Sequence, residues 1–278
     1  MKIGVIGAGA MGGGIAQTFA QNDEYQVVLC SSNPDSAARG KNKVEKRLMG
    51  RVAKGKMTQE EAQKILDKIT VGDLDACSDC DVVIESIPED MEKKQVLMKK
   101  LDAICKEGCI LASNTSSLSI TEIAAGITHP VVGMHFFNPA PIMKLVEIAA
   151  GLNTPEETVN TIVELAKKLG KVPVEVKDNA GFVVNRILIP MINEAIGLYA
   201  EGVASVEGID SAMKLGANHP MGPLALGDFI GLDICLAIME ALYNETGDTK
   251  YRPHPLLRKM VRGGWLGVKS GKGFYNYG

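Results

Sequence analysis

The sequence predicts an α/β protein with a Rossmann-like, doubly wound, mainly parallel sheet, followed by a smaller all-helical domain. Short apolar runs rich in valine and isoleucine alternate with helical patterns in the first half of the chain. A glycine-rich turn follows the first of these runs. Beyond about residue 180 the helical patterns continue but the strand patterns stop. We therefore expect a Rossmann-like domain at 1–180, with a helical insertion at about 36–67, and a helical domain at 181–278.

The expected strands are short runs that are apolar on both faces. They are 2–6, 26–30, 81–85, 109–112, 131–134 and 172–176. Segment 143–148 follows a tight turn, so we expect it to pair antiparallel with 131–134. The expected helices show apolar residues at helical spacing. They are 91–104, 155–168, 182–200, 205–215, 224–246 and 255–262, with the domain boundary near Asp178–Gly181.

Composition is that of an ordinary globular protein. The 278 residues are 46% hydrophobic and 23% charged, with a net charge of −3, so no general attraction to nucleic acid or membranes is expected. Six cysteines lie at irregular spacings with no histidine beside them, which favours free thiols in a reducing cytoplasm over a metal site. The first strand begins at once, so we expect no signal peptide and a cytoplasmic location.

The glycine-rich turn has the pattern of a dinucleotide-binding loop. Gly7 permits a tight turn, Gly9 lets a pyrophosphate approach the backbone, and Gly12 lets the helix pack close to the strand. Ala10 and Met11 complete the loop, and the N-terminus of the following helix favours phosphate. The turn therefore predicts a nicotinamide cofactor, NAD(H).

Ser31 stands where such a fold expects an acidic residue to hold the adenine ribose hydroxyls. A serine cannot accept two hydroxyl donors as a carboxylate does, and it does not repel a 2′-phosphate. Arg39 and Lys41 are near in sequence. We therefore expect relaxed cofactor choice, with NADP(H) accepted as well.

His135 follows an apolar run and precedes the turn Asn138–Pro141. Ligands of open α/β sheets lie at the carboxyl ends of the strands. If the turn reverses the chain, Glu147 can face His135, fix its tautomer and raise its basicity. The alternative is a hairpin ion pair with no chemistry, and spacing alone leaves the two equally weighted. The other histidines, at 129, 219 and 254, lie near prolines in expected loops, which favours structural or surface roles.

Two polar stretches favour the catalytic interpretation. Five small polar residues, Ser113–Ser117, follow another strand of the same sheet, and a helix cap would explain only one of them. Asn185 lies in a very apolar helix, where an amide needs a hydrogen-bonding partner. That partner is either a neighbouring group or a polar ligand.

At this point the motifs resemble those of a known family over nearly the whole chain. GAGAMGGGIAQ, ASNTSSLSI, GMHFFNPAPIMKLVEI, GFVVNRILIPMINEA, AMKLGANHPMGPLALGD and SGKGFYNY resemble the short-chain (S)-3-hydroxyacyl-CoA dehydrogenase family, in particular bacterial 3-hydroxybutyryl-CoA dehydrogenases. The resemblance implies NAD(P)H-dependent reduction of acetoacetyl-CoA to (S)-3-hydroxybutyryl-CoA, an acyl-CoA partner, and a homodimer formed through the helical domain. Ser31, and Pro88 before Glu89, depart from the family pattern.

The resemblance also implies roles for individual residues. His135 would be the acid/base with Glu147 as its partner, and Ser116 and Asn185 would contact the reacting oxygen. The residues implied to line the cofactor are Glu89, Lys94, Asn114, Asn138 and Lys269.

A basic segment, Arg39–Lys56, suggests where the acyl carrier binds. Lys43, Arg47, Arg51 and Lys54 fall on one helical face, and a second face is apolar, formed by Val44, Leu48 and Val52. A solvated face is the ordinary explanation of a charge run, but the single sign favours the phosphates of coenzyme A. By the resemblance, Lys54 matches a CoA-binding lysine, and Arg51 is a second candidate. We expect no metal.

Other functions are possible on the same fold. A β-hydroxyacid dehydrogenase would need a lysine on the first helix of the second domain, and no lysine occurs between Lys177 and Lys214. A non-catalytic dinucleotide-binding relative would not need the set His135, Glu147, Ser116 and Asn185.

Overall fold

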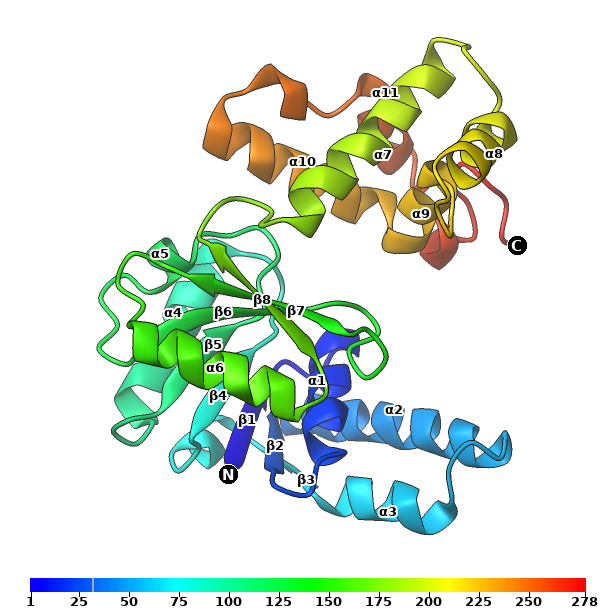
Figure 1. The fold of residues 1–278 in the computed structure, drawn as a ribbon. Coiled ribbons are helices and arrows are strands. Elements are labelled where there is room, and N and C mark those ends of the chain that lie inside the picture. The colour runs from blue at the N-terminus through cyan, green and yellow to red at the C-terminus, as the bar shows by residue number, and fades with distance from the viewer. Residues whose placement is uncertain (32) are drawn as a thin grey trace. The chain divides into compact units, whose positions relative to one another are not determined.

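The chain forms two compact units, Met1–Asp178 and Asn179–Gly278 (Figure 1). The computed structural model describes residues 1–31 and 33–278.

The first unit is built on one eight-stranded sheet in the order β3-β2-β1-β4-β5-β6-β7-β8. The strands are β1 Lys2–Ile6, β2 Gln26–Cys30, β3 Ile69–Gly72, β4 Val82–Glu85, β5 Ile110–Ser113, β6 Val131–Phe136, β7 Leu145–Ala150 and β8 Val172–Lys177. Neighbouring strands are parallel except β6 and β7, which are antiparallel. The predicted fold class and the predicted antiparallel return are therefore confirmed.

Strand β3 is absent from the sequence prediction. It has four residues, lies at the edge of the sheet, and only Ile69 is fully buried. A short half-exposed strand gives neither a long apolar run nor a clear alternation, so the pattern that identified the other strands does not identify this one.

Helices cover both faces of the sheet. They are α1 Ala10–Ala20, α2 Pro34–Ala53, α3 Gln59–Asp67, α4 Met91–Ile104, α5 Ile120–Ile123 and α6 Glu156–Lys168, with the 3₁₀-helix η1 at Leu74–Cys77. Helices α1 and α6 share one apolar core cluster on one face, while α4 lies on the other (Figure 1). In that cluster the rings of Phe19 on α1 and Phe136 on β6 meet edge to face, with centroids 6.4 Å apart. Helix α1 is thereby fixed against the strand that carries His135.

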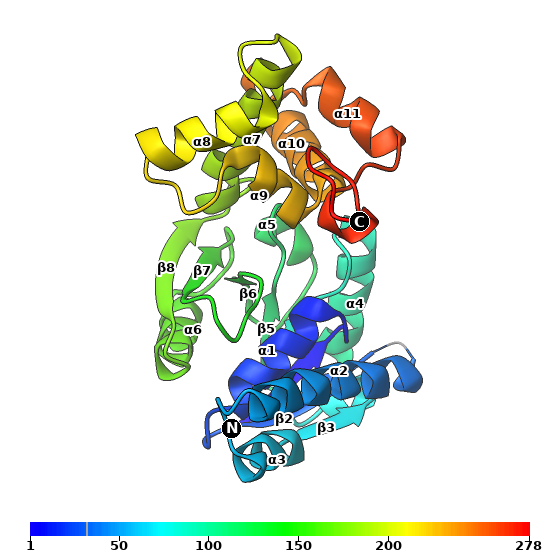
Figure 2. The ribbon, with the colours of Figure 1, turned by 90° about the vertical axis from the view of Figure 1, so that its right-hand side faces the viewer.

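The basic segment forms α2, which pairs with α3 as a helical hairpin beside α1 (Figure 2). Thr58 and Glu61 form a reciprocal capping box that begins α3. The close packing of α2 on the glycine loop depends on Gly40, since a Cβ there would lie 2.6 Å from the Cβ of Ala8. The basic helix is therefore held directly against the predicted cofactor loop.

The regular secondary structure of the second unit is helical in its described residues, apart from isolated bridges near its end. Its helices are α7 Val184–Ala200, α8 Val206–Gly216, α9 Pro223–Ile230, α10 Leu232–Thr246 and α11 Pro255–Arg262, with the 3₁₀-helices η2 Thr249–Tyr251 and η3 Val268–Ser270. The prediction of one continuous helix over 224–246 is wrong. Gly231 has a φ of 106°, which ends α9 and starts α10.

Two buried carboxylates hold the second unit together. Asp228 accepts hydrogen bonds from the backbone N–H groups of Phe274 and Tyr275, so it ties the C-terminal segment to α9. Asp210 accepts from the N–H groups of Leu224 and Ala225 at the start of α9. These charge-assisted bonds replace hydration that the carboxylates lose on burial.

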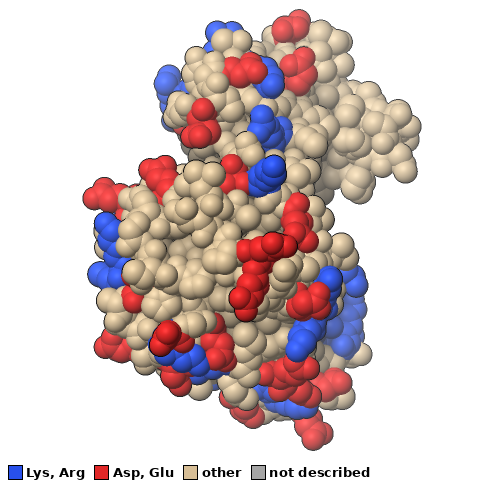
Figure 3. Space-filling view, turned by 60° about the vertical axis from the view of Figure 1, so that its left-hand side comes forward, with Lys and Arg blue, Asp and Glu red and all other residues tan. Residues whose placement is uncertain are grey.

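The surface carries both signs of charge. On the face in Figure 3, acidic side chains gather near the centre and basic side chains lie beside them, in keeping with the net charge of −3. In the described part of the chain, no helix combines the length and the apolar character needed to cross a membrane.

Candidate active site

His135 and Glu147 face one another across the two antiparallel strands. The register pairs them directly, and His135 Nδ1 lies 2.8 Å from Glu147 Oε2. Both are buried, at 6% and 1% exposure, and the ring of Phe137 lies 4.5 Å from the imidazole, centroid to centroid. Since Glu147 engages Nδ1, proton exchange with a substrate would use Nε2.

The turn that follows His135 is held by a buried lysine. Lys171 Nζ donates to the carbonyl oxygens of Ala140, at 2.6 Å, and Met143, at 2.8 Å. Burial, aided by repulsion from Lys144, holds the pKa of Lys171 below its ordinary value. Lys171 therefore fixes the return from β6 to β7, and with it the position of Glu147 relative to His135.

The polar loop Ser113–Ser117 begins at the carboxyl end of β5, the strand beside β6. Asn114 Oδ1 accepts a hydrogen bond of 2.8 Å from the backbone N–H of Phe136. This bond joins the loop to the residue that follows His135. The carboxyl ends of two neighbouring strands thus present the histidine and the serine-rich loop on one edge of the sheet.

Glu89 organises this loop. One of its carboxylate oxygens accepts from the N–H groups of Ser116 (2.9 Å) and Ser117 (3.0 Å), and from the hydroxyls of Thr115, Ser116 and Ser117. Partial burial favours the protonated acid, but Lys94 and these hydrogen bonds outweigh it and hold the pKa of Glu89 below its usual value. Glu89 is therefore a carboxylate near neutral pH.

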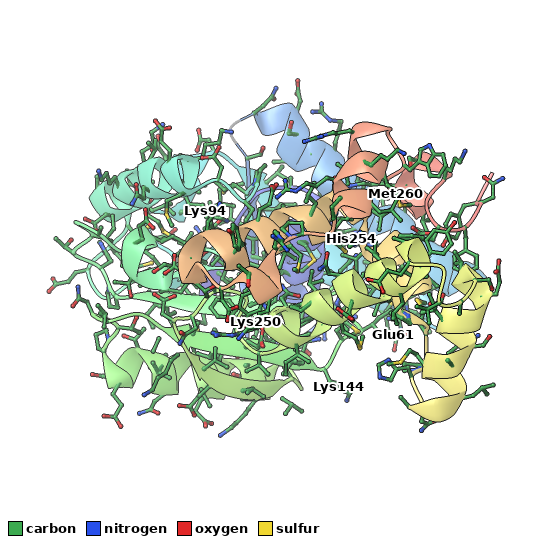
Figure 4. All side chains as sticks on the ribbon, turned by 90° about the horizontal axis from the view of Figure 1, so that it is seen from above. Glu61, Lys94, Lys144, Lys250, His254 and Met260 are labelled. Atoms are coloured by element: carbon green, nitrogen blue, oxygen red, sulfur yellow. The ribbon has the colours of Figure 1, made fainter. Side chains whose placement is uncertain are left out.

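Lys94 lies on the inner side of α4 (Figure 4), where its ammonium is buried between two carboxylates. Its Nζ lies 2.7 and 2.8 Å from the two oxygens of Glu85, and 3.5 Å from Glu89 Oε2. Glu85 ends β4 and was not identified from the sequence. The signal that could have found it is a carboxylate closing the apolar run VVIE, where a buried charge requires a partner.

The glycine loop has the geometry of a phosphate cradle. Gly7 has a φ of 105°, and a Cβ on Gly12 would lie 1.7 Å from the Gly7 carbonyl oxygen, so both positions require glycine. A Cβ on Gly9 would meet nothing within 4 Å, which leaves open space above the start of α1. No side chain caps α1, so none competes there with a ligand for the N–H groups of Ala10, Met11 and Gly12. The loop therefore fits a dinucleotide.

Ser31 directly follows β2 and is half-buried, so the second strand ends without a carboxylate at that position. Asn138 is exposed in the turn after His135. In the second unit, Asn185 lies in the first turn of α7, and Lys269 lies in η3 with its Nζ 2.6 Å from Asp233.

Arg51 and Lys54 are exposed at the end of α2, where Lys54 is the C-terminal cap. Neither forms an ion pair with another residue that the structure describes. Hydrogen bonds from Thr58, helped by the nearby charge of Arg51, lower the pKa of the Glu61 carboxyl, so of the two cations only Lys54 has no charged neighbour identified among the described residues. All six cysteines are free, and no group of three or more metal-ligating side chains occurs among the described residues.

Comparison with known proteins matches both units to one family. Residues 2–179 match the family model described as "3-hydroxyacyl-CoA dehydrogenase, NAD binding domain", and residues 181–277 match "3-hydroxyacyl-CoA dehydrogenase, C-terminal domain". The chain is 55% identical to "Probable 3-hydroxybutyryl-CoA dehydrogenase" of Bacillus subtilis (strain 168), covering 99% of this chain and 97% of that protein. It is also 55% identical to "3-hydroxybutyryl-CoA dehydrogenase" of Clostridioides difficile, covering 100% and 99%.

A solved structure agrees with these matches. The crystal structure of (S)-3-hydroxybutyryl-CoA dehydrogenase from Ralstonia eutropha has a TM-score of 0.94 and 47% identity, covering 100% of this chain and 99% of that one.

Proposed function

This chain belongs to the 3-hydroxyacyl-CoA dehydrogenase family, and we propose that it reversibly reduces acetoacetyl-CoA to (S)-3-hydroxybutyryl-CoA with a reduced nicotinamide dinucleotide. The observation that carries the proposal is the buried His135–Glu147 pair at the carboxyl end of β6, with a nitrogen–oxygen distance of 2.8 Å.

The reaction requires a proton donor for the carbonyl oxygen. When bound, the nicotinamide supplies the hydride that reaches the substrate carbon. His135 donates its proton from Nε2 to the oxygen during reduction, and takes it back during oxidation of the alcohol. Glu147 holds the ring in place and stabilises its cationic form through Nδ1.

Ser116 and Asn185 bind the carbonyl oxygen as negative charge develops on it. Each such donor contributes roughly 3 kcal/mol to the stability of the transition state in comparable sites. The support for Ser116 is its position in the loop at the end of β5, joined to β6 through Asn114. The support for Asn185 is the family motif GFVVNR.

The glycine loop would hold the cofactor, with the N–H groups at the start of α1 available to its phosphates. The open space above Gly9 and the absence of a side-chain cap on α1 support this position. Glu89, Asn114, Asn138 and Lys269 line the nicotinamide side. Because Ser31, directly after β2, is not a carboxylate, the enzyme uses both NADH and NADPH.

Coenzyme A binds along the basic face of α2, where Arg51 and Lys54 contact its phosphates. Both are exposed, and both lie at the C-terminal end of the helix that packs against the glycine loop. Two exposed apolar side chains on the helical unit, Ile187 at 68% and Phe229 at 57%, support a homodimer through this unit, which also serves the substrate. The net charge of −3 and the six free thiols support a cytoplasmic enzyme without nucleic acid or membrane partners.

An assay at 340 nm with acetoacetyl-CoA and each reduced cofactor tests the activity and the cofactor choice together. We expect turnover with both, and kcat/KM values that differ by much less than a factor of about 1,000, since Ser31 lacks the charge that repels a 2′-phosphate. No turnover with either cofactor would contradict the activity. A preference for NADH of about 1,000-fold or more would contradict only the cofactor assignment.

Lys54→Ala tests the acyl-carrier site. We expect the KM for acetoacetyl-CoA to rise about 5-fold to 10-fold with kcat little changed, because loss of one phosphate contact weakens ground-state and transition-state binding alike. The control is Lys167→Ala, which removes an exposed lysine from α6 that pairs with Glu164 at 2.7 Å. An unchanged KM in Lys54→Ala would exclude that lysine from the site.

A further inference from the structure

We propose that Glu85 is a positioning residue, which fixes the backbone of Ser116 through two routes. One route runs through the ion pairs that Lys94 forms with Glu85 and Glu89, and the other runs through a hydrogen bond to Ser113. The inference rests on the proposed function, because it gives Ser116 the role of binding the substrate oxygen. It adds to that function a carboxylate that ends β4 and that acts through other residues.

The first route passes through the buried ion pair. Glu85 is 0% exposed and Lys94 is 1% exposed, and the two carboxylate oxygens of Glu85 lie 2.7 and 2.8 Å from Nζ. The same ammonium lies 3.5 Å from Glu89 Oε2 and donates to the Ile87 carbonyl at 3.3 Å. Lys94 therefore holds one oxygen of Glu89, which leaves the other oxygen directed at the serine loop.

That other oxygen, Oε1, accepts from the N–H groups of Ser116 and Ser117 at 2.9 and 3.0 Å. It also accepts from the hydroxyls of Thr115 at 2.6 Å and Ser117 at 2.9 Å. Residues 115–117 of the loop thus all donate hydrogen bonds to Glu89 Oε1. The orientation of the Glu89 carboxylate therefore determines where the Ser116 backbone lies.

The second route runs through β5. The register pairs Glu85 with Ser113, whose hydroxyl donates to Glu85 Oε1. The Ser113 hydroxyl oxygen in turn accepts from the N–H of Thr115 at 3.1 Å. Both routes begin at one buried carboxylate and end on adjacent residues of the loop, so removal of Glu85 and Lys94 together disrupts them at the same time.

This geometry separates a positioning role from direct cofactor binding by Lys94. Its three hydrogen bonds, to the two oxygens of Glu85 and to the carbonyl oxygen of Ile87, match the three donors of an ammonium group. With all three donors used in this way, the Lys94 ammonium positions its carboxylate neighbours. Its loss is expected to change the chemical step more than the affinity for the dinucleotide.

The test uses the double variant Glu85→Met/Lys94→Met, in which neither buried charge is left without its partner. We expect kcat for acetoacetyl-CoA to fall about 30-fold, while the dissociation constant for NADH, measured by fluorescence, changes less than about 3-fold. In the Ser116→Ala background the same double change should lower kcat by less than about 3-fold, because residues acting through one group show overlapping effects. The matched control, Lys93→Met, removes an exposed ion pair with Asp90 from the same helix and should leave kcat unchanged.

Amide hydrogen exchange supplies a readout that needs no activity. In the wild-type protein the N–H groups of Ser116 and Ser117 should exchange slowly, and in the double variant at least about 10-fold faster. Fast exchange of both amides in the wild type would overturn the proposal even if no variant folds.

Two kinetic results would also overturn it: a kcat effect of the same size with and without Ser116, or a loss of NADH affinity with kcat unchanged. Failure of the proposed function would instead appear as absence of turnover in the wild type, with the amide result still measurable.

Discussion

Two histidine–carboxylate pairs flank a single strand of this protein. His129 precedes β6, and its Nδ1 lies 2.7 Å from Asp102. His135 lies at the other end of β6, and its Nδ1 lies 2.8 Å from Glu147. The pair distances are almost the same, yet only the second pair lies at the carboxyl end of the strand, where open α/β sheets bind their ligands.

A histidine–carboxylate pair is therefore not by itself a signature of catalysis. His129 Nε2 lies 3.1 Å from the carbonyl oxygen of Lys106, so both ring nitrogens contact the protein. Asp102 also accepts from the backbone N–H groups of Thr128 and His129, which makes it a brace for the loop before β6. The surroundings give the amino-end pair a structural role, and we propose a chemical role for the carboxyl-end pair.

The largest expected effect comes from removing each imidazole. We expect His135→Gln to lower kcat about 1,000-fold, because general acid catalysis by one side chain contributes about 10²-fold to 10⁴-fold. His129→Gln should lower kcat less than about 3-fold while reducing the free energy of unfolding. Steady-state assays at 340 nm and denaturant titrations of both variants compare the two ends of β6. Equal losses of activity in the two variants would contradict the assignment of different roles to His135 and His129.

The next effect comes from the carboxylates. Glu147→Gln should lower kcat roughly 10-fold to 100-fold, since the amide keeps the shape but no longer stabilises a cationic imidazole. Asp102→Asn should leave kcat within about 2-fold of the wild type and shift the unfolding midpoint instead. If Asp102→Asn were the more damaging to turnover, the assignment of roles would be reversed.

The smallest effect is the pH dependence of stability at the amino-end pair. Burial opposes ionisation of Asp102, but hydrogen bonds from His129 and Thr128 outweigh it and lower its pKa from 3.8 to about 2. Because the folded pKa is depressed, Asp102 stabilises the fold above about pH 4, and this contribution is lost as the pH falls toward 2.

The stability contributed by His129 depends on pH in the opposite direction. Burial disfavours its cation, yet Asp102 and the Lys106 carbonyl raise its pKa above the ordinary value. Its contribution is therefore complete below about pH 6.5 and is lost as the pH rises through the raised pKa. Urea unfolding of wild type and Asp102→Asn should differ most between about pH 4 and 6.5. A difference that does not vary with pH would refute this account of the pair.

The sequence allowed the fold class and the carboxyl-end pair to be predicted because both follow from local patterns. Apolar runs predicted the parallel strands other than β3, and the turn Asn138–Pro141 predicted the antiparallel pairing that sets His135 opposite Glu147. The helix over 224–246 was wrong because its apolar spacing continues through Gly231, and only the backbone conformation at that residue breaks it.

The supports of the site could not be predicted, since they join residues from separate elements. Lys94 on α4 donates a hydrogen bond to Glu85 at the end of β4, and Lys171 donates to two backbone carbonyls of the turn before β7. Asp178 likewise binds the start of α5 through Ser119, Ile120 and Thr121. The spacing of residues in the sequence does not predict such contacts, because they depend on how helices and strands pack.

The most direct test of the central claim is a single-turnover measurement of hydride transfer in His135→Ala. NADH is bound first, acetoacetyl-CoA is added by rapid mixing, and absorbance at 340 nm is followed. We predict that the variant binds NADH with an affinity within about 3-fold of the wild type but transfers hydride about 1,000-fold more slowly. Transfer at the wild-type rate would contradict the claim that the imidazole at the carboxyl end of β6 donates the proton.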